Sequence, residues 1–65
     1  MDEREKLRHL LRHWMEHNRE HAEVYRDWAE KVSASGNREL SKVLDRLHHE
    51  TEKLNELFEE AMKIV

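Results

Sequence analysis

The stretch Ser33-Ala34-Ser35-Gly36-Asn37 decides the fold, because it is the one cluster of turn-forming residues in a chain of 65. The chain has no proline, and Gly36 is its only glycine. A glycine at this place is suited to the left-handed conformation that ends a helix. Ser35 or Asn37 can then cap the next helix by accepting a hydrogen bond from a free backbone N–H. The sequence therefore predicts one turn over residues 34–37.

Both segments beside this turn carry apolar residues at helical spacing, which predicts an all-α, single-domain protein. Asp2 and Glu5 have the spacing of a capping box at the start of a helix. We expect helices over about residues 3–33 and 38–64, running antiparallel because the loop is short, with residue i roughly opposite residue 71 − i. The expected core stripe includes Leu7, Leu11, Trp14, Tyr25, Trp28 and Val32, and then Leu40, Val43, Leu44, Leu47, Leu54, Leu57, Phe58, Ala61 and Val65.

A lone hairpin of this size is a poor fold on its own. A domain this small buries only ~60% of the surface that its unfolded chain exposes. There is no cysteine for a disulfide. A single pair of helices would leave much of Trp14, Trp28, Leu47 and Phe58 in water. We therefore expect a homodimer in which two hairpins form a four-helix bundle, with docking onto another protein as the alternative.

The composition argues against several classes of partner. Charged residues make up 42% of the chain, the net charge is −3, and the two signs are mixed along the whole length. Nucleic-acid binders concentrate Lys and Arg on one face, and a membrane span needs ~20 apolar residues in a row. Neither pattern is present, and the N-terminal residues lack a signal-peptide core. We expect a cytoplasmic protein that binds neither nucleic acid nor membrane.

Midway along the first helix the apolar stripe is broken by Asn18 and His21, and Thr51 lies opposite them. Polar residues in a core are costly unless they are hydrogen-bonded or bind a metal. His21 ends a ladder of four histidines, each four residues after the last, and neighbours at this spacing lie ~5–6 Å apart on a helix. The rotation of ~100° per residue predicts which members face the seam between the helices. They are His17 and His21, with His13 as a third ligand and His9 at the surface.

Glu50 is expected opposite His21 and supplies a carboxylate. Imidazole with carboxylate suits Zn(II), Ni(II) or Co(II), and without thiolates Cu(I) is disfavoured. The sequence thus predicts a metal-binding module for sensing, storage or delivery. A polar core layer in a metal-free interaction hairpin and a pH-responsive layer are the alternatives. The predicted ligands are His13, His17, His21 and Glu50, while His48, expected to flank the stripe, and His49, expected in solvent, are weaker candidates.

Two overlapping segments, His13–His17 and His17–His21, match the H-x-x-E-H pattern of one class of metallopeptidases. A repeat of period four with abundant Glu produces this pattern by chance. The chain is also too short to build a substrate cleft. We therefore expect no enzymatic activity.

The segment His13-Trp14-Met15-Glu16-His17-Asn18-Arg19-Glu20-His21-Ala22 resembles a small domain family of archaea and bacteria. Members of that family carry an H-W-x-x-H-N-x-x-H-A motif, a glycine turn and a second acidic helix. The resemblance covers the chain from about Leu7 and implies a two-helix domain compatible with metal binding, without an established activity. His9, His48 and His49 are not part of the motif. A designed mini-protein is the alternative origin, suggested by the even charge mixing and the absence of Pro and Cys.

Overall fold

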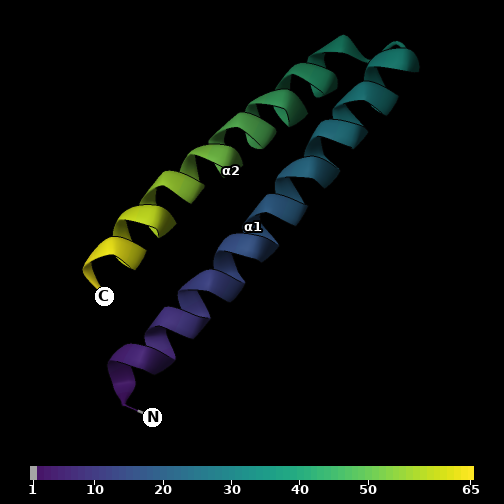
Figure 1. Ribbon diagram of the computed structural model, residues 1–65. Coiled ribbons are helices and arrows are strands. Elements are labelled where there is room, and N and C mark those ends of the chain that lie inside the picture. The colour runs from purple at the N-terminus through teal and green to yellow at the C-terminus, as the bar shows by residue number, and fades with distance from the viewer. Residues whose placement is uncertain (1) are drawn as a thin grey trace.

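The computed structural model describes residues 2–65 and consists of two helices, α1 (Glu3–Ala34) and α2 (Arg38–Ile64). They lie side by side and antiparallel, with both termini at the end away from the turn (Figure 1). The prediction of an all-helical pair is therefore confirmed. The molecule measures 51 × 16 × 10 Å and its radius of gyration is 15.3 Å. A compact domain of this length would have a radius of gyration of roughly 11 Å, so the hairpin is a rod.

Each helix begins at a capped residue. The Asp2 side chain accepts a hydrogen bond from the Glu5 backbone N–H at 2.8 Å, as its spacing predicted. Gly36 has a φ of 96° and ends the turn in the left-handed region that favours glycine. The Asn37 side chain then accepts from the Leu40 backbone N–H at 3.2 Å and starts α2. The turn is thus built by the residues that the sequence singled out. Among the described residues, no helix is long and apolar enough to cross a membrane.

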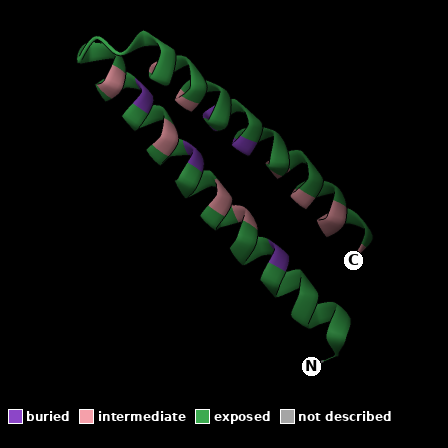
Figure 2. Ribbon diagram, turned by 180° about the vertical axis from the view of Figure 1, so that it is seen from behind, coloured by how far each residue is buried: buried purple, intermediate pink, exposed green. Residues whose placement is uncertain are grey.

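The buried and half-buried residues recur at alternating spacings of three and four. A seven-residue repeat of this kind is the signature of a coiled coil, here formed by the two antiparallel helices of one chain. Figure 2 shows these residues along the facing sides of both helices. We call them the seam. They are Leu11, Met15, Asn18, Ala22, Tyr25, Ala29 and Val32 from α1, and Ser41, Leu44, His48, Thr51, Asn55, Phe58, Met62 and Val65 from the second half of the chain. Ala61, next to Met62, is half-buried as well but lies outside this repeat.

Side chains hydrogen-bond across the seam from its middle to the turn end, with donor–acceptor distances of 2.7 to 3.0 Å. Three of these contacts end on a backbone carbonyl oxygen, which requires the two helices to approach closely. The approach is possible because Ala22 and Ala29 are small, and they are only 3% and 5% exposed. The contacts join Asn18 to the Thr51 carbonyl and the Asn55 side chain, His48 to the Ala22 carbonyl, and Ser41 to the Ala29 carbonyl.

The seam lies one position away from the expected stripe at three places along α1. Ala22 is buried instead of His21, so the prediction that His17 and His21 face the seam is wrong, and both are exposed. The reason is steric, because a large side chain at this position would hold the backbones apart. The other two places are Met15 and Ala29, which are more buried than Trp14 and Trp28.

The second helix departs from expectation more widely. Leu40, Val43, Leu54 and Leu57 were expected in the core but are exposed, because each lies one position before a seam residue and is turned away from α1. Two further residues also differ. His48 was expected to flank the stripe but is 8% exposed and lies in the seam. Phe58 was expected to remain largely exposed to solvent but is half-buried. The placement of Asn18 and Thr51 at a polar break within the core is confirmed, because Asn18 is half-buried and Thr51 is buried.

The Asn18 contacts generate a test of the seam. An Asn18→Asp variant cannot donate, and its carboxylate would face the Thr51 carbonyl oxygen that now accepts at 2.7 Å. We expect a loss of about 2–3 kcal/mol in the free energy of unfolding at pH 7. Urea denaturation followed by circular dichroism measures it. The matched control is Asn37→Asp, which should be neutral because Asn37 only accepts and Asp caps a helix equally well. An equal effect at both sites would contradict the assignment.

Candidate functional site

Large apolar side chains outside the seam follow a second seven-residue pattern. All but Leu7 directly precede a seam residue in the sequence, and every one of them is more than a third exposed. They are Leu7, Leu10, Trp14, Val24 and Trp28 in α1, and Leu40, Val43, Leu47, Leu54, Leu57 and Ile64 in α2.

These two stripes lie on the same side of the hairpin. One step back along a helix rotates a side chain by ~100° from the seam. Because α1 and α2 run in opposite directions (Figure 1), this rotation turns both stripes toward the same side. The exposed apolar residues therefore form one long surface, which we call the apolar face.

The apolar face is interrupted midway by polar residues at the same helical positions. These residues are His17 and His21 on α1 and Glu50 on α2, and all three are exposed. We call them the central polar layer. Apolar residues lie on both sides of the layer along the rod, with Trp14 before it and Val24 after it on α1.

The rings of the ladder are close to one another. The centroids of His17 and His21 are 6.5 Å apart. Two imidazoles on one tetrahedral zinc ion would have centroids roughly 5 Å apart, since each Zn–N bond is about 2.0–2.1 Å. His13 and His17 are closer, with centroids 4.3 Å apart and rings edge to face. To share one ion, His17 and His21 would therefore have to approach each other by side-chain rotation, while His13 and His17 would have to separate.

Glu50 does not join these histidines within one hairpin. Its carboxylate lies 3.3 Å from the Lys53 ammonium on the same helix. His17 instead has Glu20 as its nearest carboxylate, with Nδ1 3.8 Å from Oε2. In the described part of the chain, the set of three possible ligands that lie within 4.8 Å of one another is on α2: His48, His49 and Glu52.

That α2 cluster is centred on His48. Its Nε2 lies 2.9 Å from Glu52 Oε1, and His49 Nδ1 lies 3.9 Å from the same oxygen. His49 Nε2 is also 3.5 Å from Asp45 Oδ2. Glu52 and Asp45 each follow a seam residue by one position, so they turn to the side opposite the apolar face. Arg19 of α1 shares that side, which we call the charged side.

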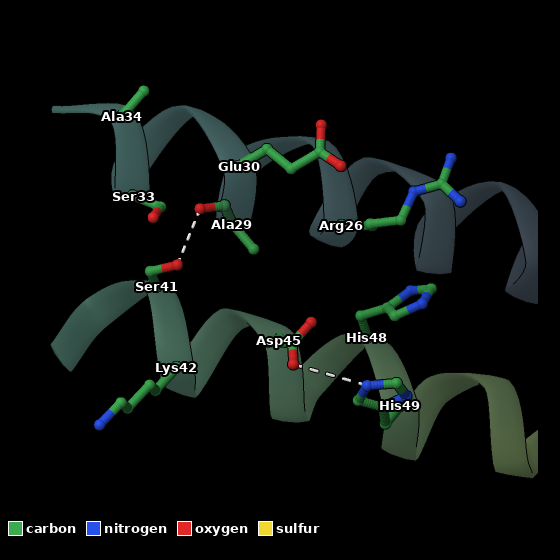
Figure 3. A pocket seen from close by; sticks show the side chains of 10 residues that line it. All are labelled: Arg26, Ala29, Glu30, Ser33, Ala34, Ser41, Lys42, Asp45, His48 and His49. Carbon is green, nitrogen blue, oxygen red and sulfur yellow. Dashed lines mark hydrogen bonds and ion pairs between the residues drawn. The ribbon is translucent and has the colours of Figure 1, made fainter. Parts of the chain in front are cut away.

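Two hollows on the charged side are both lined by His48. Figure 3 shows the one nearer the turn, where the His48 ring reaches toward α1 and His49 is turned to Asp45. The other hollow adds Glu52 and Arg19 to its lining. The sequence does contain a signal for this cluster, because His48 lies at heptad spacing from the other seam residues of α2. That spacing can be recognised only once the seam residues are known.

Comparison with known proteins gives a family without a described activity. No curated protein and no solved structure matches the chain. The model of one protein family, described as a domain of unknown function (DUF8180), matches residues 7–65. The match begins at the residue from which the family resemblance was expected. The chain belongs to this DUF8180 family.

Proposed function

We propose that two copies of this hairpin associate through their apolar faces into a four-helix bundle that binds a divalent transition metal. The metal would be Zn(II) or Ni(II), held at the central polar layer. The observation that carries the proposal is the exposed apolar face with His17, His21 and Glu50 at its middle.

The surface area supports an association of this extent. The hairpin exposes 5427 Å² for a mass of 8.0 kDa. A compact monomer of that mass exposes roughly 4,450 Å², so the excess is roughly 1,000 Å². A standard protein interface buries ≈800 Å² on each partner. The excess surface of one hairpin is therefore enough for one stable interface.

The pattern of the face favours a second copy of the chain as the partner. In a dimer with a two-fold axis, a patch at the axis meets the same patch of its mate. An axis through the middle of the apolar face would bring layer against layer and apolar residues against apolar residues. Each hairpin would contribute His17, His21 and Glu50 to one shared level. A different partner protein would need polar groups of its own placed opposite the central polar layer.

Burial of that layer creates the need for a cation. Imidazoles and carboxylates removed from water are costly unless they are paired or bind a metal. Their donor atoms suit Zn(II) and Ni(II). His13 lies one turn before His17 and stays the third ligand expected from its spacing on the same helix. Metal binding and association would then support each other, and the module could sense, store or deliver the ion.

Association is tested with a charge placed on the apolar face. We expect the protein to sediment as a dimer and Leu47→Glu to weaken the dimer by about a hundredfold or more, because the carboxylate would be buried unpaired. Analytical ultracentrifugation measures the dissociation constant. The control His9→Glu adds the same group to an exposed position outside the apolar face and should change little. A monomeric wild-type protein, or equal effects of the two variants, would count against the interface.

Metal binding at the layer is tested through its linkage to the dimer. Zinc added to chelator-treated protein should tighten the dimer, since a ligand stabilises the state that binds it. The double variant His17→Ala, His21→Ala should lose this effect and Glu50→Gln should weaken it, whereas His9→Ala should keep it. The effect should also fade at pH 5, because a protonated imidazole does not bind metal.

A dimer that forms equally well with and without zinc would contradict the metal part of the proposal. The interaction hairpin without metal would then be the better description. In that case His21→Leu should stabilise the dimer, since it extends the apolar face through the polar layer.

A further inference from the structure

The His48 side chain lies between two groups that can only accept hydrogen bonds. Its Nδ1 is 2.7 Å from the Ala22 carbonyl oxygen on α1. Its Nε2 is 2.9 Å from the Glu52 carboxylate on α2, and the side chain is 10% exposed. Burial and two short contacts therefore fix the ring in place.

The two contacts together require a cation. A carbonyl oxygen accepts, so Nδ1 must carry a proton and donate it. A neutral imidazole has only that one N–H, which leaves a lone pair on Nε2 directed at the Glu52 carboxylate. Two lone-pair atoms 2.9 Å apart repel each other. A cation must lie between them, and it is either a second proton or a metal ion.

The neighbouring residues complete the ligand set of a metal. His49 Nδ1 is 3.9 Å from Glu52 Oε1, and the ligand atoms of all three residues lie within 4.8 Å of one another. Ligand atoms around a tetrahedral zinc ion are roughly 3.3 Å apart, given Zn–N and Zn–O bonds of about 2.0–2.2 Å. His49 and Glu52 are exposed and can close the difference by rotating, while His48 stays anchored.

The surroundings resemble the outer shell of known metal sites. A histidine that binds a metal usually donates its other ring N–H to a carbonyl or carboxylate, which sets the tautomer and orients the ring. The Ala22 carbonyl does this for His48, and Asp45 lies 3.5 Å from the second ring nitrogen of His49. Both histidines thus have such a partner.

Two arginines of the charged side have acidic partners of their own. The Arg19 guanidinium lies 3.8 Å from the Glu59 carboxylate. Arg26 Nε lies 4.0 Å from Asp27. Their positive charges are therefore partly offset by nearby carboxylates, which reduces their repulsion of a cation at His48.

We propose that His48, His49 and Glu52 form a second metal site, one per hairpin, for a zinc-like divalent cation. It lies on the charged side and is complete within one chain, so it depends on neither the dimer nor the central polar layer. The ligands are on α2, but the His48 hydrogen bond ends on α1. Binding would strengthen the N–H donor of His48 and so stabilise the packing of the two helices.

The test uses the full chain with His17→Ala and His21→Ala, which removes both histidines of the central polar layer. Zinc is titrated in competition with a chromophoric chelator. We expect one zinc per hairpin, a rise in melting temperature, and an affinity that falls at least tenfold with His49→Ala or Glu52→Gln. His9→Ala serves as the matched control and should leave the affinity unchanged. His48 itself is kept, because it belongs to the seam.

Nitrogen-15 NMR of the His48 ring separates a metal from a proton. Zinc should shift Nε2 while Nδ1 stays protonated. Absence of zinc binding in this background, an unchanged affinity in Glu52→Gln, or a His48 ring that carries both protons with zinc present would each overturn the proposal. These outcomes leave the proposed dimer untouched, because the background lacks the two histidines at the centre of its metal site.

Discussion

The close approach of α1 and α2 at Ala22 and Ala29 is the constraint on which the rest of the structure depends. Only small side chains at these positions let His48 and Ser41 of the facing helix reach the backbone carbonyls of α1. Those hydrogen bonds hold the helices in one rotational setting. A shift by one residue along α1 would bring His21 into the seam, where its ring would separate the backbones and break the contact of His48 with the Ala22 carbonyl.

This setting divides the side chains of the hairpin into three groups. Small and polar residues occupy the middle of the seam, large apolar residues lie on one side of it, and charged residues lie on the other. Few apolar side chains are buried by the hairpin itself, and they are Leu11, Ala22 and Ala29. Most of the hydrophobic free energy available to the chain is therefore still unused, and the apolar face is where a further contact would release it.

The two helices, the turn and the polar break could be predicted, because spacing, capping and glycine chemistry are local. Which residues of each helix face the other helix could not be predicted. The expected and observed frames of α1 share Leu11, Asn18, Tyr25 and Val32 and differ only by one residue at three places between them. Hydrophobicity favours the frame with the two tryptophans, whereas close packing favours the frame with the alanines. His48 was misplaced for a similar reason, since its burial depends on how near α1 lies. Whether His13, His17, His21 and Glu50 bind a metal remains a prediction.

Polar residues continue through the hairpin at one level, from the apolar face to the charged side. His17 and His21 directly precede Asn18 and Ala22, Glu50 directly precedes Thr51, and His48 connects Ala22 with Glu52. Such a level weakens the core but restricts the register of the helices. If α2 slid by one heptad toward its N-terminal end, Asn18 would face Phe58 and Met62 in place of Thr51 and Asn55. Its buried amide would then lose the Asn55 acceptor. The polar residues that weaken the hydrophobic core are therefore the ones that fix a single register between α1 and α2. The polar residues at this level would also set the register of a second hairpin packed against the first.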